Sequence, residues 1–157
     1  MTKRRVYIET TVISYLTAWT GRDVVRVAHQ QITRDWWSRR DRFDLFVSEA
    51  VLREAGAGDP TAAADRLASL SGIPILVVTP AAGDLAKRLL HDQALPGVAA
   101  ADAVHVAVAA TSGMDFLLTW NCRHIANAVT RFKIERSCRL AGLAPPIICT
   151  PEELNEG

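Results

Sequence analysis

The sequence predicts an α/β fold with a central parallel sheet that helices cover on both faces. Short runs rich in Val, Ile, Leu and Phe alternate along the chain with longer helical segments, and glycines and prolines separate them. This alternation is typical of parallel sheets, because parallel strands need a long crossover, usually a helix. The chain has 157 residues, of which 49% are hydrophobic and 22% charged. We therefore expect a single domain, residues 1–157, with one core.

The predicted strands are apolar runs bounded by charged or turn-forming residues. The first run, VYI, stops at an acid, Glu9, and the second, DLFVS, leads directly into a helical segment. The five predicted strands cover residues 6–8, 44–48, 74–78, 115–120 and 146–149.

Glycine and proline set most of the predicted helix boundaries. Gly21 separates the first two helices, Pro60 lies in the first turn of the fourth, Pro80 opens the fifth, and Gly113 ends an alanine-rich helix. The predicted helices cover residues 11–19, 23–40, 49–55, 60–70, 80–91, 99–112 and 124–140.

Composition disfavours several classes of protein. The formal net charge of +1 gives no global basic field, so a nucleic-acid surface would have to be a local patch. The three cysteines form no C-x-x-C pair and indicate reduced thiols rather than a zinc site or disulfides. The basic opening MTKRR lacks the apolar core of a signal peptide, and Asp102 and His105 interrupt the most apolar stretch. We expect a soluble, cytoplasmic protein with no membrane span.

Polar side chains recur where the predicted strands end. Glu9 follows the first strand, Glu54 lies on the helix after the second, and Thr119 and Asn121 follow the fourth. Asp102 opens the alanine-rich helix beside a small, apolar surface, where an acid needs a partner or a metal. Sites in parallel sheets form beyond the carboxyl ends of the strands, and oxygen ligands suit Mg²⁺ or Mn²⁺. Such a metal could orient a water molecule for phosphodiester hydrolysis.

Each of these residues also has a structural interpretation. Glu9 could cap the helix that follows it, and Glu54 could be a solvated acid. His105, one turn after Asp102, is better explained as a core or surface histidine than as a ligand, and Asn121 could be a turn residue. Asp102 is the hardest to dismiss because its neighbours are apolar.

Four segments together resemble the PIN-domain family, in particular the VapC-like toxins of bacterial toxin–antitoxin pairs. They are IETTVISYL, SEAVLRE, ADAVHVAVA and FLLTWNCRHIAN, and the resemblance spans about residues 5–150. It implies a three-layer α/β/α sandwich and a metal-dependent endoribonuclease that hydrolyses RNA.

The resemblance also assigns the site. It implies that Glu9, Glu54 and Asp102 bind the metal and that Asn121 stands where many members carry a fourth acid, with Thr119 as the neighbouring hydroxyl. This chain has Glu9 where Asp is commoner, and Asn121 is neutral. With one negative charge fewer, one metal ion, or a weak second one, is favoured.

Basic residues suggest where a substrate could bind. Thr119, Arg123 and His124 are the predicted substrate contacts, and the last two closely follow Asn121, where they are well placed for a scissile phosphate. Trp36 and Trp37 stand among arginines in QQITRDWWSRRDRF, which could grip RNA. An amphipathic helix whose tryptophans enter the core or a subunit interface is the favoured explanation. The resemblance further implies a homodimer and an antitoxin partner that covers the active groove.

Two other functions remain open. A catalytically weak or inactive binding module on the same fold is the main alternative, because Asn121 is neutral. A phosphatase with an aspartyl nucleophile is disfavoured, because Thr10 and Thr11 occupy the stretch after the first strand. Glycine-rich nucleotide-binding motifs do not occur in the sequence.

Overall fold

The computed structural model describes residues 2–155 and places five parallel strands in one sheet, in the order β3-β2-β1-β4-β5. The chain moves from the central strand to one edge, then returns and builds the other half of the sheet. The strands are β1 (Arg4–Ile8), β2 (Phe43–Ser48), β3 (Ile75–Leu76), β4 (Phe116–Leu118) and β5 (Ile147–Cys149). The predicted parallel sheet is confirmed.

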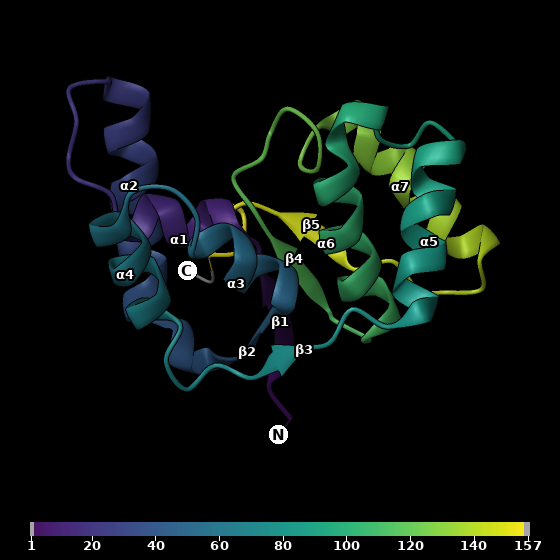
Figure 1. Ribbon diagram of the computed structural model, residues 1–157, viewed down its shortest axis with the longest axis horizontal. Helices are drawn as coiled ribbons and strands as arrows, with labels where there is room; N and C mark the ends of the chain where they lie inside the picture. The colour runs from purple at the N-terminus through teal and green to yellow at the C-terminus, as the bar shows by residue number, and fades with distance from the viewer. Residues whose placement is uncertain (1, 156–157) are drawn as a thin grey trace.

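Helices cover both faces of this sheet. In Figure 1, α1, α2 and α4 lie on one side of the strands and α5, α6 and α7 on the other. The helices of the described residues are α1 (Thr10–Thr17), α2 (Val24–Ser38), α3 (Glu49–Ala55), α4 (Pro60–Ser69), α5 (Pro80–His91), α6 (Ala100–Thr111) and α7 (Ala128–Leu140), with short 3-10 turns at Arg40–Arg42 and Gly97–Ala99. The α/β/α sandwich is therefore confirmed. No helix in residues 2–155 combines the length and the apolar character that crossing a membrane requires.

Two strands turn directly into helices, without a loop. Glu9 follows β1 and is the N-cap of α1, where its side chain accepts the Thr11 N–H (3.0 Å). Ser48 ends β2 and is the N-cap of α3, where its hydroxyl accepts the Val51 N–H (3.4 Å). These caps satisfy helix donors that would otherwise be orphaned. They also place polar side chains at the carboxyl edge of the sheet.

The edge strand β3 is shorter than the predicted 74–78. Its backbone leaves the sheet after Leu76, and the Val78 N–H donates to the side chain of Glu49 (3.1 Å) rather than to a strand. Pro74 has no N–H to donate, although its carbonyl accepts from Val47 (3.1 Å).

The last helix begins later than the predicted residue 124. Residues 121–126 form turns, in which the Ile125 and Ala126 N–H groups both donate to the Asn121 carbonyl (3.1 and 2.8 Å). Asn127 then caps α7 by accepting the Val129 N–H (2.9 Å). Most of the predicted segment is helical, but its first residues form these turns, so α7 begins at Ala128.

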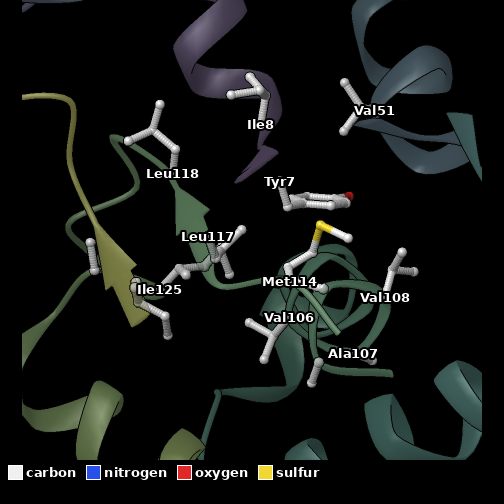
Figure 2. Close-up of a cluster of buried hydrophobic side chains, with 14 of the residues drawn as sticks. Tyr7, Ile8, Val51, Val106, Ala107, Val108, Met114, Leu117, Leu118 and Ile125 are labelled. Atoms are coloured by element: carbon white, nitrogen blue, oxygen red, sulfur yellow. The ribbon is translucent and has the colours of Figure 1, made fainter. Parts of the chain in front are cut away.

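The core packs around β1 and β4. Figure 2 shows the ring of Tyr7 among apolar side chains, including Val51 of α3 and Met114 of the turn between α6 and β4. Trp36 is 1% exposed, and its indole N–H donates to the Leu154 carbonyl (2.9 Å). Trp37 is half-buried beneath Arg40, whose guanidinium lies 4.7 Å from the ring centroid. The explanation that placed these tryptophans in the core is thus correct for Trp36, whereas Trp37 packs against the outside of the core.

Candidate functional site

Glu9 and Thr119 meet where the order of the strands reverses. The Glu9 N–H donates to the Leu118 carbonyl (3.0 Å), so the end of β1 stays beside the end of β4. Glu9 is 3% exposed and is the only buried carboxylate in residues 2–155. Thr119 is fully buried and donates its hydroxyl to Glu9 Oε1 (2.5 Å). Such a switch point is where ligands bind in open α/β sheets.

Backbone donors fix the direction of the hydrogen bonds to Glu9. The Thr119 hydroxyl accepts the Asn121 N–H, and the Thr11 hydroxyl accepts the Trp120 N–H, both at 2.9 Å. Each hydroxyl can therefore turn its own hydrogen toward Glu9 Oε1, at 2.5 Å. With the Thr11 N–H on Oε2, both oxygens of this buried carboxylate have donors, as burial requires.

Glu54 reaches the same edge from the last turn of α3. Its Oε1 accepts hydrogen bonds from the Thr10 hydroxyl and from His105 Nε2, the latter at 2.6 Å. No donor in the described residues contacts its Oε2. Burial raises the pKa of Glu54, but the hydrogen bonds from His105 and Thr10, with the positive charges of His105 and Arg53, outweigh it and leave the pKa below its ordinary value.

His105 is completely buried between two hydrogen-bond partners. Its Nδ1 lies 2.7 Å from the Tyr7 hydroxyl, opposite the bond to Glu54. Burial lowers its pKa, but the bond to Glu54 and the charges of Glu9, Glu54 and Asp102 raise it above the ordinary value. Of the core and surface positions that the sequence left open for His105, the structure selects the core. One ligand atom each from Glu9, Glu54 and His105 lies within 4.8 Å of the others.

Asp102 lies in the first turn of α6, outside that group of three, and belongs to a neighbouring network. His124 Nδ1 donates to its Oδ2 (2.9 Å), and the His124 backbone N–H donates to Asn121 Oδ1 (3.0 Å). Arg123 is exposed beside them. The Asp102 side chain is 19% exposed, whereas Glu9 is 3% exposed, so Glu9 is the more deeply buried of the two acids. Asp102 lies in the first turn of α6, where its side chain is partly exposed to solvent. Glu9 lies between the carboxyl ends of β1 and β4 and is buried there.

Sequence reasoning missed Tyr7 and Ser48 as parts of this region. Tyr7 OH and Ser48 Oγ are 2.7 Å apart, and both residues are fully buried. A signal was available, because a tyrosine in a buried strand must find a partner for its hydroxyl.

The donor set fits a divalent cation. Two carboxylates approach closely, one of them buried, and Glu54 Oε2 has no donor within residues 2–155. The negative charges of Glu9, Glu54 and Asp102 all help to raise the pKa of His105, while Asp102 itself pairs with His124. Carboxylate oxygens are the ligands that Mg²⁺ and Mn²⁺ prefer, and a cation would offset the repulsion between these acids.

Comparison with known proteins shows a similarity in fold. No family model matches the sequence, and no curated protein is similar to it. Among solved structures, the fold is similar to a chain of VapBC2 from Rickettsia felis, crystallised bound to a DNA fragment from its promoter. The TM-score is 0.59 at 15% sequence identity, over 93% of this chain and 98% of that one. At this identity the similarity concerns the fold alone.

Proposed function

We propose that this protein is a divalent-metal-dependent endoribonuclease that hydrolyses RNA phosphodiester bonds. The observation that carries the proposal is the meeting of Glu9 and Glu54 at the switch point of the sheet, with Asp102 one helical turn from the histidine that contacts Glu54. The fold, which is similar to that of a VapBC2 chain, and the four PIN-like segments support the same conclusion.

Glu9, Glu54 and Asp102 would hold Mg²⁺ or Mn²⁺. When bound, the metal supplies an activated water and neutralises charge on the phosphate. Asn121 uses its Oδ1 for the His124 N–H, which leaves its amide N–H₂ to orient a water molecule or a phosphate oxygen. The exposed Arg123 lies beside it and offers a cation for the RNA backbone.

Thr119 takes a different role from the predicted substrate contact. It is fully buried, accepts from Asn121 and donates to Glu9, which supports a role in positioning Glu9. His124 is partly exposed and holds Asp102 by its Nδ1, which leaves Nε2 to face a phosphate.

The proposed biological role is that of the toxin in a toxin–antitoxin pair. It includes a homodimer, an antitoxin protein as partner and action in the cytoplasm. The motif resemblance and the similarity in fold to a VapBC2 chain support it. Co-expression with the product of a neighbouring gene would test it: the expected result is a stable complex whose RNA cleavage is suppressed.

Cleavage of an RNA panel by EDTA-treated protein, with and without added Mn²⁺, tests the activity. We expect metal-dependent cleavage that Asp102→Asn reduces by orders of magnitude. Asp115→Asn is the matched control, because Asp115 lies at the opposite edge of the sheet, where its carboxylate accepts the Arg5 N–H (2.8 Å). Equal activity of Asp102→Asn and the parent protein would contradict the proposal.

A catalytically inactive RNA-binding module is the second candidate. Asn121 favours it, because its carbonyl oxygen is already used by a backbone N–H and it contributes no charge. RNA binding without cleavage in any divalent metal would select this candidate.

A further inference from the structure

We infer that a buried chain of hydrogen bonds, Ser48–Tyr7–His105–Glu54, positions the Glu54 carboxylate for the metal, and that His105 is not itself a metal ligand. The inference rests on the proposed metal site and assigns a role to three residues behind it.

The links of the chain are short and shielded from water. Tyr7 OH lies 2.7 Å from Ser48 Oγ and 2.7 Å from His105 Nδ1, and His105 Nε2 lies 2.6 Å from Glu54 Oε1. Ser48, Tyr7 and His105 are each 0% exposed. Figure 2 shows the Tyr7 ring enclosed by apolar side chains, so its hydroxyl depends on these two partners. Buried groups of this kind strongly favour the one arrangement that satisfies them.

The direction of these bonds assigns the hydrogen on His105. A carboxylate oxygen only accepts, so the 2.6 Å contact with Glu54 requires a hydrogen on Nε2. The neutral ring then accepts the Tyr7 O–H at Nδ1, and Tyr7 accepts from Ser48. In the protonated ring Nε2 carries a hydrogen as well. A His105 that bound metal through Nε2 would carry no hydrogen on that atom, and Glu54 Oε1 would lose this donor.

The hydrogen-bond chain also joins the two ends of α3. This helix has seven residues, too few to be stable alone. Ser48 is its N-cap and Glu54 lies in its last turn, and the chain joins them through Tyr7 of β1 and His105 of α6. All described donors to Glu54 act on Oε1, His105 and Thr10 among them. The carboxylate is thus held by one oxygen, and Oε2 remains for the cation.

Titration of EDTA-treated protein with Mn²⁺ by calorimetry tests the positioning role. We expect His105→Leu to weaken Mn²⁺ binding by about 10- to 100-fold, the usual effect of losing a group that orients a ligand. His105→Gln should restore most of the affinity, because its amide N–H can reach Glu54. Tyr7→Phe removes one hydroxyl and should weaken binding in the same direction; it carries the test if His105→Leu does not fold.

Trp36→Phe is the stability control, because it removes a buried hydrogen bond to the Leu154 carbonyl that is not part of the Ser48–Tyr7–His105–Glu54 hydrogen-bond chain. It should lower the melting temperature and leave the Mn²⁺ affinity unchanged. Pulsed electron paramagnetic resonance of the Mn²⁺-loaded parent protein should show no coupling to an imidazole nitrogen.

Two results would overturn the inference while the metal site stands. In the first, His105→Leu or Tyr7→Phe binds Mn²⁺ as tightly as the parent protein, so the chain does not position Glu54. In the second, a nitrogen coupling that disappears in His105→Gln makes His105 a ligand. A parent protein that binds no Mn²⁺ would remove the proposed site and this inference together.

Discussion

Replacing Glu9 by glutamine should abolish stabilisation by metal while changing the metal-free protein little. Two effects oppose each other in the absence of metal. Ligand atoms of Glu9 and Glu54 lie within 4.8 Å, a repulsion of about 3.5 kcal/mol at an effective dielectric constant of 20 and about 1 kcal/mol in water. Glu54 is 36% exposed, so the value near the solvent limit, about 1–2 kcal/mol, applies.

The opposing effect is the loss of hydrogen bonds. The glutamine N–H₂ must face either the Thr11 N–H or the two threonine hydroxyls that now donate to Glu9. A mismatch of this kind costs about 1–3 kcal/mol, which offsets the relief of repulsion. Glu9→Gln without metal should therefore differ from the parent protein by no more than about 2 kcal/mol.

Added metal should stabilise the parent protein but not Glu9→Gln. At a free Mn²⁺ concentration of 100 times Kd, binding stabilises the parent protein by about 2.7 kcal/mol. For a chain of 157 residues this raises the melting temperature by about 5–11 °C. Differential scanning fluorimetry of EDTA-treated protein with graded Mn²⁺ should show this rise in the parent protein and less than about 1 °C in Glu9→Gln. A full rise in Glu9→Gln would show that the ion binds elsewhere, and the reasoning about this site would be refuted.

Three further predictions concern the same region. Asp102→Asn should reduce RNA cleavage by orders of magnitude in a metal-dependent assay with Asp115→Asn as control, and undiminished cleavage would move the activity elsewhere. Asn121→Asp should tighten Mn²⁺ binding in calorimetry by adding a charge; two tightly bound ions in the parent protein would contradict the one-metal view. Without metal, stability should depend on pH through Glu54 and His105. Because the pKa of Glu54 is lowered on folding, Glu54 adds stability above its ordinary pKa of about 4.3, and this stability is lost as the pH falls through the folded pKa. Because the pKa of His105 is raised on folding, His105 adds stability below its ordinary pKa of about 6.5, and this stability is lost as the pH rises through the folded pKa. Melting temperatures should therefore be highest between about pH 4.5 and 6.5, and a curve that is flat on the alkaline side would exclude the His105 contribution.

The sheet could be predicted because its signals are local. Each strand is an apolar run, and each transition from strand to helix carries a capping residue, such as Glu9 after β1 and Ser48 after β2. The errors lie where tertiary contacts outweigh such signals. β3 ends early because Glu49 takes the Val78 N–H, and α7 starts late because the Asn121 carbonyl accepts two backbone N–H groups instead.

The candidate site divides in the same way. The order of elements along the chain sufficed to bring Glu9, Glu54 and Thr119 toward one edge, because parallel strands share a carboxyl end. The depth of each acid could not be read from its neighbours in the sequence. Apolar residues flank Asp102 in the sequence, yet it lies in the first turn of α6 and is partly exposed. Glu9, in contrast, is buried between the ends of β1 and β4.

The sequence by itself therefore determined the parallel sheet, its covering helices and the set of acids at its edge, since periodicity and capping act over a few residues. Only the tertiary structure decided which side chains hold those acids. Tyr7 meets Ser48 across 41 positions and His105 across 98, and His105 meets Glu54 across 51. These contacts depend on how α3 packs against α6 over the end of β1. A buried hydroxyl or imidazole pairs with whichever group that packing brings within hydrogen-bonding distance, and no local pattern specifies the partner.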